Sequence, residues 1–193
     1  MPREYLKKAD LTATSDAHNV HETVQAILND IESGGDAKAL EYAAKFDRYE
    51  GSILLSPEEI EAAAALVPEK VKRDIEFSHD NVRRFAEAQK STVQDFEVEI
   101  VPGLIAGQKA MPVEAAGCYV PGGRYSHIAS ALMTITTAKV AGVPHITAVS
   151  PTRPGVGIPD AIIYAMDLAG ADLILNLGGV QGIAAMAQGL FGA

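Results

Sequence analysis

Three glycine-containing turns, each following an apolar run, are the clearest candidates for chemistry in this sequence; they lie at residues 121–126, 150–155 and 178–181. Glycine lets a ligand approach the backbone, and the start of a helix offers N–H groups and positive potential to an anion. Any single turn of this kind could serve only to reverse the chain. Three turns on one edge of a sheet would favour a nucleotide or anion site.

Polar and aromatic side chains flank these turns. Tyr119 could stack on a base or a ribose, or it could belong to the core. Arg124 suits a negative ligand group, although most arginines are only solvated, and Ser126 is the predicted N-cap of a helix. His127 could contact a ligand, whereas a lone histidine is usually structural. Gln181 follows two glycines at a helix start, where its amide could bridge a ligand hydroxyl.

The residues needed for metal binding or acid–base catalysis do not come together in the sequence. His18 and His21 form an HxxH pair, but no acidic or cysteine partner stands at a metal-ligand spacing. Cys118 lies inside a predicted strand beside no obvious base, which favours a buried structural thiol. No histidine–carboxylate couple stands out. We therefore predict no metal ligand and no catalytic residue in this chain.

Alternating strands and helices are expected to position the three turns. The predicted strands cover 117–120, 145–150 and 173–178, and the predicted helices cover about 127–141, 158–169 and a segment from 181. This alternation indicates βαβ units and a parallel sheet. Ligands of such sheets lie beyond the carboxyl ends of the strands, where all three turns should open.

The preceding residues have a different, charged and helical character. The glycines after Ser33 should end a first helix, and Ser56 with Glu59 forms a predicted capping box. Residues 95–115 alternate around a Pro-Gly turn, which predicts a hairpin. Apolar side chains predicted to lie on the packed faces of these helices include Val20, Ile31, Leu40, Phe46, Val71, Ile75, Val82, Phe85 and Ala86.

Composition excludes several classes of protein. The 193 residues carry a net charge of −9 and have a pI near 5, which argues against a nucleic-acid surface. A single cysteine excludes an internal disulfide framework and favours a reducing compartment. The sequence has no apolar run of membrane-spanning length, and its start is too polar for a signal peptide. The prediction is a cytoplasmic protein that binds neither nucleic acid nor membrane.

Several segments resemble the histidinol dehydrogenase family. They are GQKAMPVEAAGCYVPGG, LMTITTAKVAGV and AGADLILNLGGVQGIAAMAQG, with GDAKALEYAAKFD, SPEEIEAA and NVRRFAEAQ upstream. The resemblance covers nearly the whole chain. It implies a zinc-dependent, NAD-linked enzyme that oxidises a primary alcohol through an aldehyde to a carboxylate, and an intertwined homodimer.

The resemblance also implies a fold and its division into domains. The expected fold is α/β, with a helical N-terminal region and an incomplete doubly wound, Rossmann-like parallel sheet related to aldehyde dehydrogenases. Residues 1–18 would form a tail that could exchange between the subunits of a dimer. Residues 19–116 would be the helical and hairpin part of a first, incomplete domain. Residues 117–193 would be a truncated NAD-binding domain.

Tyr119 matches the family tyrosine that contacts NAD, and Gln181 matches its NAD-binding glutamine. With the turns, the implied cofactor-binding set is Tyr119, Pro121, Gly122, Gly123, Pro151, Gly178, Gly179 and Gln181. The zinc ligands and the Glu-His acid–base pair of the family lie beyond residue 193, so we expect this chain alone to be inactive. It would be the N-terminal portion of an enzyme; the alternative is an inactive stand-alone module for nucleotide binding or dimerisation.

The loop GGRYSHIASALM departs from histidinol dehydrogenases, which usually carry small residues and a proline at positions 124–127. It looks more like the paralogs that oxidise other alcohols, among them sulfopropanediol dehydrogenase. An arginine suits an anionic substrate or a cofactor phosphate better than cationic histidinol. Arg124 and His127 are the predicted substrate contacts, and the substrate is histidinol or an anionic or polyol alcohol.

Overall fold

The structure is a computed structural model that describes residues 14–122 and 125–193, with side chains from residue 19 onward. The predictions for Gly123 and Arg124, and for most of the tail at 1–18, lie outside the described residues.

The predicted alternation of strands and helices is confirmed. The elements are β3 (Ala115–Tyr119), α4 (Ile128–Ala141), β4 (His145–Val149), α5 (Asp160–Ala169), β5 (Leu173–Leu175) and α6 (Gly179–Gln188). The strands are parallel and lie in the order β3-β4-β5. Parallel strands need a crossover longer than a tight turn, which α4 and α5 supply.

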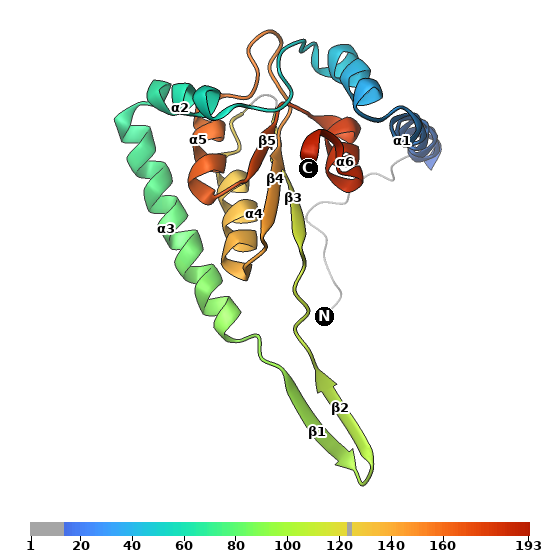
Figure 1. Cartoon of the computed structure of the whole chain (residues 1–193), viewed down its shortest axis with the longest axis vertical. Helices are drawn as coiled ribbons and strands as arrows, with labels where there is room; N and C mark the ends of the chain where they lie inside the picture. The colour runs from blue at the N-terminus through green and yellow to red at the C-terminus, as the bar shows by residue number, and fades with distance from the viewer. Residues whose placement is uncertain (1–13, 123–124) are drawn as a thin grey trace, which may run out of the picture.

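Helices cover both faces of this sheet, as expected for a doubly wound α/β fold (Figure 1). One face carries α4 and α5, with α2 (Pro57–Leu66) against α5 and α3 (Glu69–Ser91) against α4. The other face carries α6, against which α1 (Thr14–Tyr42) packs. In the described part of the chain, no helix is long and apolar enough to cross a membrane.

The strand β5 is shorter than predicted because the chain beyond it pairs elsewhere. Leu54 forms an antiparallel bridge with Leu175. The Asn176 amide donates to the Ile53 carbonyl at 2.8 Å, and the Leu55 amide donates to the Ile174 carbonyl at 3.0 Å. A segment of the N-terminal half is therefore attached to the β5 edge of the sheet.

The predicted break after Ser33 is present as a kink. Gly35 has φ 58° and ψ −147°, and a second helical stretch continues to Tyr42. One π-helical turn, Ala43–Asp47, follows and ends at Arg48, whose backbone is left-handed with φ 52°. This turn brings Asp47 to the sheet.

The predicted capping box at the start of α2 is confirmed. The Glu59 amide donates to Ser56 Oγ at 3.2 Å, and the Ser56 amide donates to Glu59 Oε2 at 2.7 Å.

The predicted packed faces of the N-terminal helices were too wide. Phe85 is 66% exposed although its neighbour Ala86 is buried, because α3 touches α4 along a narrower stripe. Three further predicted face residues are also exposed: Val20, Leu40 and Phe46.

The predicted hairpin is confirmed as β1 (Phe96–Val101) and β2 (Leu104–Gln108), paired antiparallel. It extends away from the body of the molecule (Figure 1). Every residue of both strands is exposed. The large apolar side chains left open on it are Phe96, Val98, Ile100, Val101, Leu104 and Ile105. So many exposed apolar side chains on one hairpin are typical of an interface.

The core between α5 and the sheet should be sensitive to cavities. Ile162 of α5 is fully buried in the main cluster. We expect Ile162→Ala to lower the free energy of unfolding by about 2–5 kcal/mol, since the lost packing adds to the lost transfer energy. Ile183→Ala is the matched control, because Ile183 is 53% exposed. Urea unfolding curves of both variants give the comparison, and equal losses would contradict the assigned core.

Candidate functional site

The loops after the three strands converge around Pro151. A Cβ atom added to Gly178 would lie 2.8 Å from Pro151 Cα, and one added to Gly122 would lie 3.0 Å from the Pro151 carbonyl oxygen. Glycine is therefore required at Gly178 for the loops to pack together, and a side chain at Gly122 would force a shift. The expected meeting of these turns at one edge is confirmed, while contact with a cofactor stays a prediction.

Tyr119 connects the end of β3 to the start of α6. Its side chain is half-buried, and its hydroxyl oxygen accepts a hydrogen bond from the Gly179 amide at 3.1 Å. The hydroxyl proton remains able to donate to another group. Tyr119 is thus positioned at the carboxyl edge, with its donor capacity intact.

Gln181 is buried in the first turn of α6, with 1% of its surface exposed. Its Nε2 donates to Asp47 Oδ2 at 2.9 Å. Its Oε1 has no hydrogen-bond partner among the described residues. Buried polar atoms are nearly always paired, so an unpartnered acceptor at this edge is a candidate ligand contact.

The start of α6 does not offer the free amides expected at Gly178 and Gly179. The Gly178 amide donates to Asp47 Oδ2 at 3.2 Å, and the Gly179 amide donates to Tyr119. A carboxylate is favoured at a helix N-terminus by the helix dipole. The protein's own Asp47 therefore takes the place that an anion would take in the simplest nucleotide-binding turn.

Two buried hydroxyls flank Pro151. Ser150 Oγ and Thr152 Oγ1 also lack hydrogen-bond partners in the described part of the chain. With Gln181 Oε1, three unpartnered polar atoms lie in the loop that follows β4 and in the first turn of α6. Buried polar atoms without partners at the carboxyl edge are the chemistry expected of a site that receives a polar ligand.

Asn176, which sequence reasoning did not single out, is buried at the end of β5. Its Nδ2 donates to the Tyr49 hydroxyl at 3.1 Å and to the Ser52 carbonyl at 2.9 Å. Its Oδ1 accepts from the Ile158 amide at 3.3 Å. Burial raises the pKa of Tyr49. Because Asn176 is satisfied within the protein, it holds the chain after β5 in place.

His127 and Ser126, which follow the first turn, form no side-chain cap at the start of α4. His127 is exposed and lies directly before this helix. The prediction of Ser126 as the N-cap is wrong. His127 occupies that position, and its carbonyl accepts from the Ser130 amide at 3.0 Å.

The described residues do not fit a zinc site. Within 14–122 and 125–193, as far as side chains are described, no three histidine, cysteine, aspartate or glutamate side chains gather as metal ligands. His145 instead contacts the Thr147 hydroxyl at 3.2 Å.

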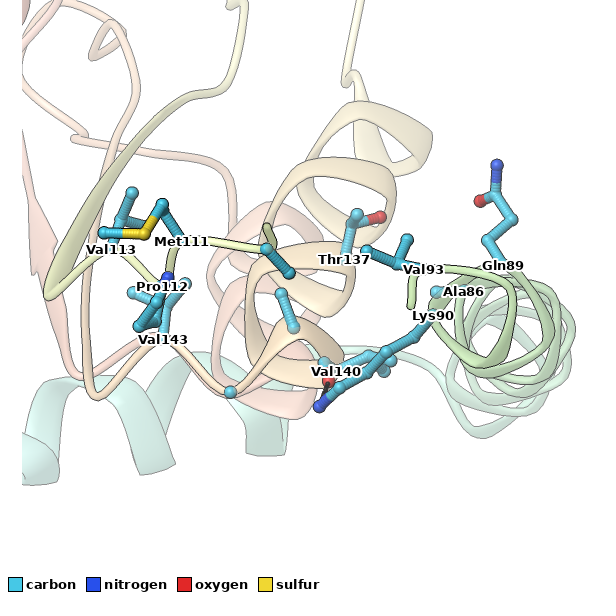
Figure 2. Close-up of a pocket in the computed structure, with 13 residues that line it drawn as sticks. Ala86, Gln89, Lys90, Val93, Met111, Pro112, Val113, Thr137, Val140 and Val143 are labelled. Atoms are coloured by element: carbon cyan, nitrogen blue, oxygen red, sulfur yellow. Dashed lines mark hydrogen bonds between the residues drawn. The ribbon is translucent and has the colours of Figure 1, made fainter. Parts of the chain in front are cut away.

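A cavity of about 560 Å³ lies away from these loops, between α3, α4 and the segment before β3 (Figure 2). Its walls include Met111, Val113 and Val143. Lys90 is held there by donating to the Val140 carbonyl at 2.8 Å. The walls of the cavity are largely apolar and it lies away from the glycine turns, so the carboxyl edge with its buried polar atoms remains the candidate site.

Fold and edge together define a doubly wound α/β protein with a polar, glycine-lined site at the carboxyl ends of its strands. The model of the histidinol dehydrogenase family matches residues 11–192, and the chain belongs to this family.

Several relatives support this membership. A sulfopropanediol 3-dehydrogenase from Ruegeria pomeroyi is 72% identical over 100% of this chain and 44% of its own length. A histidinol dehydrogenase from Methanosarcina barkeri is 38% identical over 93% of this chain and 41% of its own length. The crystal structure of histidinol dehydrogenase from Elizabethkingia anophelis matches with a TM-score of 0.80 at 30% identity, over 98% of this chain and 41% of that one. The chain thus spans less than half the length of these relatives.

The reactivity of Cys118 tests whether its thiol is structural. It is buried in β3, and burial raises the pKa of its thiol despite a hydrogen bond with Thr134. We expect a thiol-reactive disulfide reagent to modify Cys118 only as fast as the native protein opens, because reaction needs an exposed thiolate. The rate of modification is measured at neutral pH, with and without urea, from the absorbance of the group that the reagent releases. Rapid labelling of the native protein would contradict the assignment.

Proposed function

We propose that this chain is the NAD-binding portion of a zinc-dependent, NAD-linked dehydrogenase that oxidises a primary alcohol through an aldehyde to a carboxylate. The leading substrate is an anionic alcohol such as sulfopropanediol. The observation that carries this choice is the 72% identity, across the whole chain, with a sulfopropanediol 3-dehydrogenase, against 38% with a histidinol dehydrogenase.

The carboxyl edge fits a dinucleotide. Gln181 Oε1 is a buried acceptor without a partner, and Tyr119 keeps a hydroxyl proton to donate. The unpartnered Ser150 and Thr152 hydroxyls add groups that can donate and accept. NAD, when bound, would supply the acceptor for hydride. The residues named here would bind and orient it and would exclude water from their buried polar atoms.

The charge of Arg124 is a second argument for an anionic substrate. A guanidinium recognises a sulfonate, carboxylate or phosphate through paired N–H donors, and it would be repelled by a cationic amine. In the proposed enzyme, Arg124 and His127 contact the anionic substrate from the loop between β3 and α4. His127 lies at the end of that loop and is exposed, as such a contact requires.

We include zinc and the Glu-His acid–base pair in the proposal because the family resemblance implies them. We assign neither a zinc ligand nor an acid–base residue to this chain. The proposed enzyme is a cytoplasmic homodimer. The exposed apolar side chains of the β1–β2 hairpin support an interface, because a surface of this kind is usually covered in the assembled protein.

Replacing the proposed cofactor contacts should weaken NAD binding. In the protein at its full natural length, Gln181→Ala should raise the Kd for NAD about tenfold, the loss expected for one buried hydrogen bond. Gln188→Ala is the control, because Gln188 is exposed at the other end of α6. Isothermal titration calorimetry gives both values. If Gln181→Ala and the control bind NAD equally well, the assignment of Gln181 fails.

The substrate is tested by direct comparison. We expect the full-length enzyme to have a higher kcat/KM for sulfopropanediol than for histidinol. In Arg124→Ala, the ratio of the two kcat/KM values should fall by about tenfold or more, as the loss of a charged pair predicts. The 193-residue chain alone should show no turnover with NAD and zinc. The absorbance of NADH follows each of these reactions. A preference for histidinol would reject the anionic substrate.

A further inference from the structure

One carboxylate oxygen, Asp47 Oδ2, receives two hydrogen bonds from the start of α6. The Gly178 amide donates to it at 3.2 Å, and Gln181 Nε2 donates to it at 2.9 Å. Asp47 is only partly buried, and it reaches this edge from the π-helical turn that follows α1. The contact joins the two halves of the chain at the candidate site.

The contact determines which end of the Gln181 amide is available. An ionised carboxylate only accepts hydrogen bonds, so the NH₂ group of Gln181 must face Asp47. Turning the amide over would place Gln181 Oε1 against the carboxylate oxygen, which is repulsive. The atom left without a partner is consequently Oε1, in a side chain that is 1% exposed. The contact with Asp47 therefore fixes Oε1 as the acceptor that Gln181 can offer to a ligand.

We propose that Asp47 is a positioning residue for the dinucleotide site: it holds Gln181 so that Oε1 accepts a hydrogen bond from an uncharged O–H or N–H donor of the ligand. The ribose hydroxyls, the carboxamide and the adenine amino group of NAD carry such donors. This inference rests on the proposed NAD-binding function.

The same contact keeps phosphate away from the start of α6. A phosphate oxygen there would have to displace the carboxylate from the Gly178 amide or lie beside its negative charge. Two negative groups in contact repel each other. The pyrophosphate of the dinucleotide therefore binds elsewhere along the carboxyl edge, and α6 receives a neutral part of the molecule.

Two variants separate hydrogen bonding from charge. Asp47→Ala removes the acceptor, and the Kd for NAD should rise about tenfold, as expected when a positioning hydrogen bond is lost. Asp47→Asn can place its carbonyl oxygen where Oδ2 lies, so the Kd should stay within about threefold of wild type. Asp74→Ala is the control, since the Asp74 side chain is 68% exposed on α3. If Asp47→Ala does not fold, Asp47→Glu is used in its place. The longer glutamate side chain moves the carboxylate away from its position in the wild-type protein by one methylene.

Calorimetry of the full-length protein with NAD and with ADP-ribose provides the test. Equal weakening of both ligands by Asp47→Ala identifies a ribose hydroxyl or the adenine amino group as the donor, and weakening of NAD alone identifies the carboxamide. Unchanged NAD affinity in Asp47→Ala, or equal weakening in Asp47→Ala and Asp47→Asn, overturns the proposal.

Crystal structures of the two variants separate this inference from the proposed function. The Gln181 amide should move or turn over in Asp47→Ala and keep its place in Asp47→Asn. If the wild-type protein binds no NAD, the proposed function fails. The positioning role of Asp47 is then decided by the Gln181 conformation alone, and an unmoved amide in Asp47→Ala rejects it.

Discussion

Parallel pairing of β3, β4 and β5 is the constraint on which the rest of the structure depends. Parallel strands require long crossovers, and both faces of their sheet must be covered. Helices α4 and α5 cover one face and α6 the other, so each strand ends at the same edge and its loop opens there. The gathering of glycines, a tyrosine and buried hydroxyls at that edge follows from this topology.

The helical half of the chain completes this edge as well as covering the sheet. The segment around Leu54 pairs with β5, and Asn176 is held by Tyr49 and Ser52. Asp47 then accepts a hydrogen bond from the Gly178 amide, which a simple phosphate-binding turn would leave open. The site is consequently built by two parts of the chain with different composition, and its polarity is set by a carboxylate from the first part.

Sequence patterns predicted what depends on near neighbours. The capping box at Ser56 and the order of strands and helices from β3 onward were confirmed, because a few adjacent residues decide them. Phe85 was misplaced because periodicity does not say how wide a contacting stripe is. Asp47 was not singled out, since its partners lie 131 and 134 residues away and no local pattern marks it.

That separation has a consequence for folding kinetics. Closing a loop of 134 residues costs conformational entropy before the contact forms, and folding rates fall as the share of such distant contacts rises. The α3–α4 contact and the parallel pairs are nearer in sequence, so they can form while Asp47 and Gln181 are still apart. Ligand-binding competence should therefore be the last property that a refolding molecule regains, after its secondary structure has returned.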